Sequence, residues 1–103
     1  MTESEFNQLA DAALARIETA IDHCAGDVEC NRSGNVLEVE FDNGQKIIIN
    51  RHDVNQEIWV AAKSGGFHFA WQAGIWHSRR DNGELFSKLA ELFAEQSAIL
   101  QFN

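Results

Sequence analysis

The first quarter of the chain carries apolar residues at the three- and four-residue spacing of an amphipathic helix. This stripe consists of Phe6, Leu9, Ala10, Ala13, Leu14, Ile17, Ala20, Ile21 and Cys24. Thr2 and Glu5 have the spacing of a capping box at its start, and Gly26 is a suitable stop signal. We therefore predict a helix over residues 4–24 with acidic side chains on its polar side.

The middle of the chain alternates apolar and polar residues, which is the pattern of strands with one buried and one wet face. Leu37, Val39 and Phe41 show it most clearly. Asn43-Gly44 follows them, and this dipeptide is the strongest short signal for a hairpin. We predict strands over the ranges 28–30, 37–41, 46–50, 57–62, 67–71 and 75–78, with turns at 64–66 and 73–74.

Helical spacing returns near the C-terminus, where the apolar stripe consists of Leu85, Phe86, Leu89, Leu92 and Phe93. Asp81 and Glu84 again have capping-box spacing, so we predict that the second helix opens there. Short connections between the strands indicate an antiparallel sheet, and two one-sided helices must cover the same face of it. We expect an α+β two-layer sandwich, with two helices packed on one face of a five- to six-stranded antiparallel sheet, in a single domain over residues 1–103.

The chain is acidic, and its negative charge is concentrated at one end. The net charge is -8 over 103 residues, and residues 1–31 hold seven acids and one base. Such a field repels nucleic acid and anionic membranes and attracts cations and basic protein surfaces. No segment has the roughly 18 apolar residues that span a bilayer, and the N-terminus lacks the features of a signal peptide. We therefore predict a cytoplasmic protein that contacts neither nucleic acid nor membrane.

Carboxylates are the first candidate for chemistry. Glu18 and Asp22 lie one helical turn apart, and Asp27 and Glu29 follow at the turn and the next strand. Hard cations prefer clustered carboxylate oxygens, but an open surface cluster binds them weakly and without much selectivity. The alternative is a solvated helix face whose charge serves solubility.

Two cysteines and a neighbouring histidine form a second candidate. His23, Cys24 and Cys30 could suggest a soft-metal site, but zinc sites usually show cysteine pairs at shorter spacing. The favoured interpretation is two small buried hydrophobic residues and a surface imidazole. An acidic neighbourhood raises the pKa of a thiol, which argues against a reactive nucleophile.

Trp59 is the third candidate. If Ile58 and Val60 face the helices, Trp59 stands on the open face of the sheet. A large apolar side chain there indicates a partner site, unless it simply packs on its cross-strand neighbours. The chain contains no phosphate loop, nucleophile elbow or dinucleotide fingerprint, so no spacing proposes a reaction.

Several segments together resemble a known family. They are residues 43–51, 58–61 and 64–69, with 4–6 and 9–11 in the first helix. The sequence is similar to the bacterial frataxins of the CyaY type over nearly its whole length. This resemblance implies two helices on an antiparallel sheet, which the hydrophobic pattern predicts independently.

The resemblance also implies a function. Frataxins bind iron, ferrous or ferric, through an acidic ridge, and other divalent cations are expected to substitute. Carried over by position, the acidic ridge here consists of Asp11, Glu18, Asp22, Asp27 and Glu29. Docking on cysteine desulfurase and the iron–sulfur scaffold machinery would use Glu18, Asp22, Asn50 and Trp59. The resemblance thus implies a non-enzymatic regulator of iron–sulfur cluster assembly that is monomeric without metal. The alternative is an iron chaperone or store. An enzyme that oxidises ferrous iron is the least favoured interpretation.

Some positions depart from the family pattern. Thr19, His23 and Ala25 stand where acids are common, which should weaken iron binding. Glu57 replaces a glutamine and places a further negative charge beside Trp59. In the short tail after the second helix, only Ile99, Leu100 and Phe102 could cover the groove between the helices.

Overall fold

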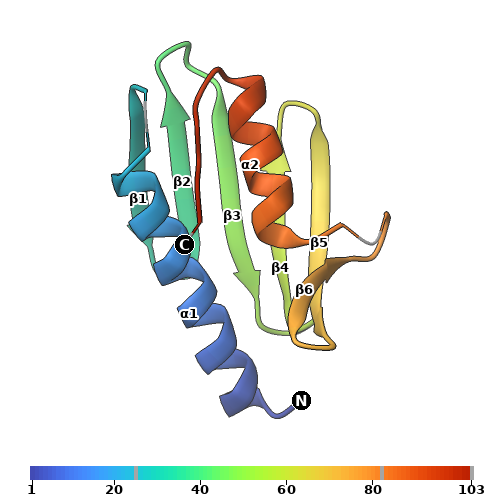
Figure 1. The fold of residues 1–103 in the computed structure, drawn as a ribbon. Coiled ribbons are helices and arrows are strands. Elements are labelled where there is room, and N and C mark those ends of the chain that lie inside the picture. The colour runs from blue at the N-terminus through green and yellow to red at the C-terminus, as the bar shows by residue number, and fades with distance from the viewer. Residues whose placement is uncertain (25, 82, 103) are drawn as a thin grey trace.

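The computed structural model describes residues 1–24, 26–81 and 83–102, so Ala25 lies outside the described residues. Six strands form one antiparallel sheet in chain order, and two helices cover one of its faces (Figure 1). The helices are α1 (Glu3–Asp22) and α2 (Leu85–Glu95). The strands are β1 (Val28–Ser33), β2 (Val36–Phe41), β3 (Lys46–His52), β4 (Glu57–Ala62), β5 (Gly65–Gln72) and β6 (Ile75–Ser78). The expected two-layer α+β sandwich is confirmed.

The start of α1 is the predicted capping box. Thr2 Oγ1 accepts a hydrogen bond from the Glu5 backbone N–H at 3.0 Å, and Glu5 Oε1 accepts one from Thr2 N–H at 3.0 Å. Two otherwise unpaired backbone donors are thereby satisfied. The helix ends at Asp22, slightly before the predicted end, with His23 as its cap.

The start of α2 differs from the prediction. Glu84, not Asp81, is the N-cap, and its carboxylate accepts hydrogen bonds from the N–H groups of Phe86 and Ser87. Glu84 also forms a β-bridge with His77, and this bridge holds the backbone extended until the helix begins at Leu85. A helical turn from Asp81 would break that bridge, so the tertiary contact overrides the local capping signal.

The core lies between the sheet and the helices. Its strand residues are the alternate positions predicted to face inward, including Leu37, Val39, Ile58 and Val60. Trp76 from β6 packs edge-to-face on Phe6 of α1, with ring centroids 6.1 Å apart. Aromatic pairs of this geometry add to the stabilisation from buried area, and this one ties the start of α1 to the last hairpin.

The strands are longer than predicted at several ends. β1 continues to Ser33, β3 to His52, and β5 begins at Gly65. Gly65 and Gly66 therefore pair with Ala62 and Ala61 instead of forming the predicted turn. These strand ends could not be predicted from local composition, because hydrogen bonds to a neighbouring strand extend each strand beyond its apolar residues.

The segment after α2 runs back between the two helices in Figure 1. Leu100 is buried and Phe102 packs against the core, whereas Ile99 is exposed. Two of the three tail residues that could cover the groove therefore lie in it, and both line the space that remains there. Among the described residues, no helix is long and apolar enough to cross a membrane.

Candidate functional site

The outer edge of α1 meets two arginines that the sequence did not single out. Arg32 of β1 lies 3.0 Å from Glu18 and 3.5 Å from Asp11. Arg51 of β3 also pairs with Asp11 and donates a hydrogen bond to Asn7. Two carboxylates of the predicted acidic ridge are thus already held by guanidinium groups of the same chain.

The other three ridge positions lie apart from this network. Asp22 is exposed at the end of α1, and Asp27 is exposed in the turn before β1. Glu29 is exposed on β1, opposite Glu40 in the antiparallel register. Because Val28 and Cys30 pack toward the core, Glu29 points to the open face of the sheet, away from α1.

This arrangement can hold a cation only loosely. Within residues 1–24, 26–81 and 83–102, no group of three or more His, Cys, Asp or Glu side chains is placed to hold a metal ion together. Asp22 and Asp27 have no ion-pair partner within the same ranges, so their oxygens remain open to cations or to a basic protein surface. The geometry fits weak and adaptable electrostatic contacts better than a rigid cage.

The cysteines behave as partly buried hydrophobic residues. Both are of intermediate burial, and both pack against the core. Burial, followed by the nearby charges of Glu18 and Asp22, raises the pKa of Cys30 to about 11. Burial also raises the pKa of Cys24. Since the thiolate is the nucleophile and the metal ligand, these environments disfavour both kinds of chemistry.

Trp59 stands on the open face of the sheet, as predicted, and it also packs on its neighbours. Its indole is stacked between two imidazoles, with centroid distances of 4.0 Å to His52 and 4.2 Å to His68 and nearly parallel planes. His68 is its direct partner in the register, and Asn50 is the partner on the other side. The stack fixes the indole orientation, so Trp59 and Asn50 form a preorganised surface.

Glu57 anchors this surface from one side. Its side chain is only 6% exposed, it pairs with Arg79, and it accepts a hydrogen bond from Trp59 Nε1 at 2.8 Å. Burial by itself would raise the pKa of Glu57, but the hydrogen bonds from Trp59 and Arg79 and the positive charge of Arg79 outweigh it and lower the pKa. Glu57 therefore places a negative charge beside Trp59, as the sequence indicated, but this charge is buried and paired with Arg79.

Replacing Glu57 with glutamine should reveal this anchor in the pH dependence of stability. Because the folded-state pKa is lowered, the ionised carboxylate stabilises the fold above the unfolded-state value and loses this contribution as the pH falls through the folded-state value. We expect Glu57→Gln to cost about 1–2 kcal/mol at neutral pH. The difference from the natural protein should shrink toward zero near pH 3.

Urea denaturation at both pH values measures this effect. Glu91→Gln is the matched control, since Glu91 is an exposed acid with a lysine partner, and it should change stability little at either pH. A cost for Glu57→Gln that is the same at both pH values would contradict the role of the ionised carboxylate.

The adjacent basic residues Arg79 and Arg80, which the sequence alone places in a solvated loop, both contact other parts of the fold. Arg79 pairs with Glu57, and Arg80 donates to the Gly66 carbonyl oxygen at 2.9 Å and lies over the Phe67 ring.

The sequence holds a partial signal for Arg32 and Arg51, the two arginines that contact α1. Side chains two residues apart in a strand point to the same face. Arg32 follows Cys30 by two residues in β1, and Arg51 follows Ile49 by two residues in β3, so both arginines point toward the helices.

Comparison with known proteins supports the family resemblance. The family model described as a frataxin-like domain matches residues 1–99. The chain is 50% identical over 98 residues to an iron–sulfur cluster assembly protein CyaY of Dechloromonas aromatica, covering 94% of this chain and 93% of that one. It is 56% identical over 91 residues to the protein of the same name from Chromobacterium violaceum, covering 88% and 87%.

A solved structure agrees with these relatives. The frataxin from Psychromonas ingrahamii is 33% identical and superposes with a TM-score of 0.91, covering 100% of this chain and 99% of that one. Sequence and fold therefore match over nearly the whole length, and the protein belongs to the frataxin-like family.

Proposed function

We propose that this protein is a regulatory adaptor of iron–sulfur cluster assembly, which docks its acidic ridge on a basic surface of cysteine desulfurase and binds iron weakly through the same carboxylates. Its relatives are named iron–sulfur cluster assembly proteins. The observation that carries the docking role is the contact of Arg32 with Asp11 and Glu18. These carboxylates are spaced to receive a guanidinium, which is the chemistry that a basic protein surface offers.

Iron delivery is the second candidate function. It is favoured by the exposed Asp22 and Asp27, which flank the turn between α1 and β1 and have no ion-pair partner within residues 1–24, 26–81 and 83–102. Iron here is cargo, held by few protein oxygens and completed by water. Binding through these groups would be weak and readily reversible, which suits transfer to a scaffold better than storage.

A metal titration followed residue by residue by NMR tests the iron site. Cobalt(II) or anaerobic ferrous iron should perturb Asp22 and Asp27 first, and Asp11 and Glu18 only at higher concentration, because Arg32 competes for them. Arg32→Gln should strengthen metal binding about two- to fivefold, the worth of an exposed ion pair. Lys46→Gln, which removes an exposed ion pair with Glu38 on the face of the sheet opposite the helices, is the control and should leave the α1 signals unchanged.

The same titration with desulfurase present separates the two roles. A desulfurase contact on the acidic ridge should broaden the signals of Glu18 and Asp22 and should move Asn50 and Trp59 if the open face also takes part. Metal perturbations centred on His52, His68 or His77 would contradict the iron site. Broadening on α2 alone would contradict the docking surface.

A further inference from the structure

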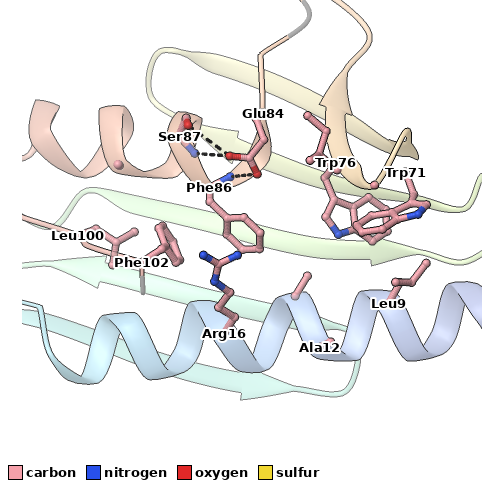
Figure 2. Close-up of a pocket in the computed structure, with 14 residues that line it drawn as sticks. Leu9, Ala12, Arg16, Trp71, Trp76, Glu84, Phe86, Ser87, Leu100 and Phe102 are labelled. Atoms are coloured by element: carbon pink, nitrogen blue, oxygen red, sulfur yellow. Dashed lines mark hydrogen bonds between the residues drawn. The ribbon is translucent and has the colours of Figure 1, made fainter.

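The two helices and the β5–β6 hairpin enclose a groove that no part of the proposed function uses. Its volume is about 640 Å³, within the range of small-molecule sites. The walls are apolar and aromatic, and the residues that matter most are Leu9, Trp71, Trp76, Phe86 and Phe102. Figure 2 shows these side chains around the space between α1, α2 and the tail.

Arg16 supplies the positive charge of this groove. Its guanidinium carbon lies 4.3 Å from the centroid of Phe86 and 5.5 Å from that of Phe102. Figure 2 shows it rising from α1 toward both rings. Within the described ranges, Arg16 has no carboxylate or carbonyl partner, whereas each of the other arginines has one: Arg32, Arg51, Arg79 and Arg80.

The carboxylate that lines the groove does not compensate Arg16. Glu84 uses both oxygens to cap α2: Oε2 accepts from Phe86 N–H at 2.9 Å, and Oε1 accepts from Ser87 N–H at 3.1 Å. Figure 2 shows these bonds directed toward the helix start. Among residues 1–24, 26–81 and 83–102, no acceptor therefore occupies the hydrogen-bonding fork of the guanidinium, which lies beside an apolar wall.

We infer that this groove binds a small amphipathic carboxylate, with its aliphatic or aromatic body against Trp71, Trp76 and Phe86 and its carboxylate on Arg16. A guanidinium matches the two oxygens of a carboxylate in a bidentate geometry. One cation in an acidic chain with a net charge of -8 suits a monoanion and disfavours phosphorylated or nucleic polyanions. The site lies apart from the Arg32 contacts of the acidic ridge, so its test does not depend on the proposed function.

Three probes with the same alkyl chain separate charge from hydrophobicity: octanoate, octan-1-ol and octylammonium. The tryptophan indole N–H signals report the location, because Trp71 and Trp76 line the groove and Trp59 lies on the other face of the sheet. Octanoate should shift the Trp71 and Trp76 signals saturably and leave Trp59 unmoved. Octanol should bind at least about tenfold more weakly, since it lacks the charge-assisted contact.

The cationic probe is the sharpest comparison. The net charge of -8 favours octylammonium at any nonspecific site, so a preference for octanoate runs against the field of the whole protein. Equal shifts of Trp71 and Trp76 by octylammonium and octanoate would overturn the proposal. So would an octanoate response that is absent or that moves all three indoles alike.

Two variants complete the test. Arg16→Gln should reduce octanoate affinity to that of octanol and leave octanol binding unchanged, whereas the control Arg80→Gln, outside the groove, should change neither. Ala12→Phe places a ring into the groove from an exposed position of α1 and should abolish binding of both probes. Unchanged octanoate affinity in Arg16→Gln would refute the role of the guanidinium.

Discussion

Replacing Arg51 with methionine should lower the free energy of unfolding by about 2–3 kcal/mol. The Arg51 side chain is 8% exposed and joins β3 to α1 through Asp11 and Asn7, with Asp53 3.1 Å away on the other side. Its guanidinium also lies over Phe6, 5.5 Å from the ring centroid. Breaking a fully buried ion pair costs about 3–5 kcal/mol. Asp11 and Asp53 are about half exposed and can regain water when Arg51 is removed, so the expected loss of stability is smaller than that.

Arg32→Met provides a matched control for this prediction. Arg32 contacts the same Asp11, yet its side chain is 33% exposed and it bridges exposed groups at the sheet edge. We expect a cost below about 1 kcal/mol for it. Thermal denaturation should show a decrease of roughly 10–20 °C for Arg51→Met and only a few degrees for Arg32→Met. Similar losses in the two variants would show that Arg51 acts as one more surface charge.

The hydrophobic pattern predicted the layers of this fold because the pattern records burial directly. Ile58 and Val60 face the core and Trp59 faces the other way, as strict alternation in β4 requires. Asn43-Gly44 marked the β2–β3 turn, where Gly44 adopts a φ of 84°. A left-handed backbone favours glycine, so this signal is local and survives without tertiary information.

The pairing of charges could not be predicted in the same way, since it depends on the sheet register. Glu57 meets Arg79 only because β4, β5 and β6 are neighbours in order. Glu29 is two residues from Asp27 in the chain, yet the pleat of β1 turns it to the open face. The sequence located the acidic end of the molecule. The structure was needed to show which carboxylates lie on each face of the sheet and which of them pair with Arg32 and Arg51.

Reversing charge at both Glu18 and Asp22 should reduce the proposed binding to cysteine desulfurase at least about a hundredfold. Each Glu18→Lys or Asp22→Lys change removes one attraction for a basic surface and adds one repulsion, so the two effects act together. Glu18 is 37% exposed in its side chain and Asp22 is exposed, so the fold should tolerate both changes. Binding of the natural protein should also weaken with added salt, because such contacts are screened.

Reversal at Glu91 and Glu95 on α2 is the control, because it changes the net charge by the same amount on another exposed surface. If docking depends on the acidic ridge, the α2 variant should keep most of the affinity of the natural protein. Equal losses in the two double variants would assign binding to net charge alone. Affinity that is insensitive to both variants and to moderate salt would rule out electrostatic docking.

Removal of Arg32 should act in the opposite direction from these reversals. Arg32 contacts Glu18 and Asp11 in this structure, so under the proposed docking a basic residue of the desulfurase would have to displace it or share its carboxylates. Arg32→Gln frees Glu18 and leaves Asp11 with Arg51 alone, so it should strengthen docking about two- to fivefold and should also strengthen metal binding at the same groups. A damaged fold would weaken binding in both variants. A gain of affinity in Arg32→Gln together with a loss of affinity in the Glu18 and Asp22 reversal therefore could not be explained by loss of structure.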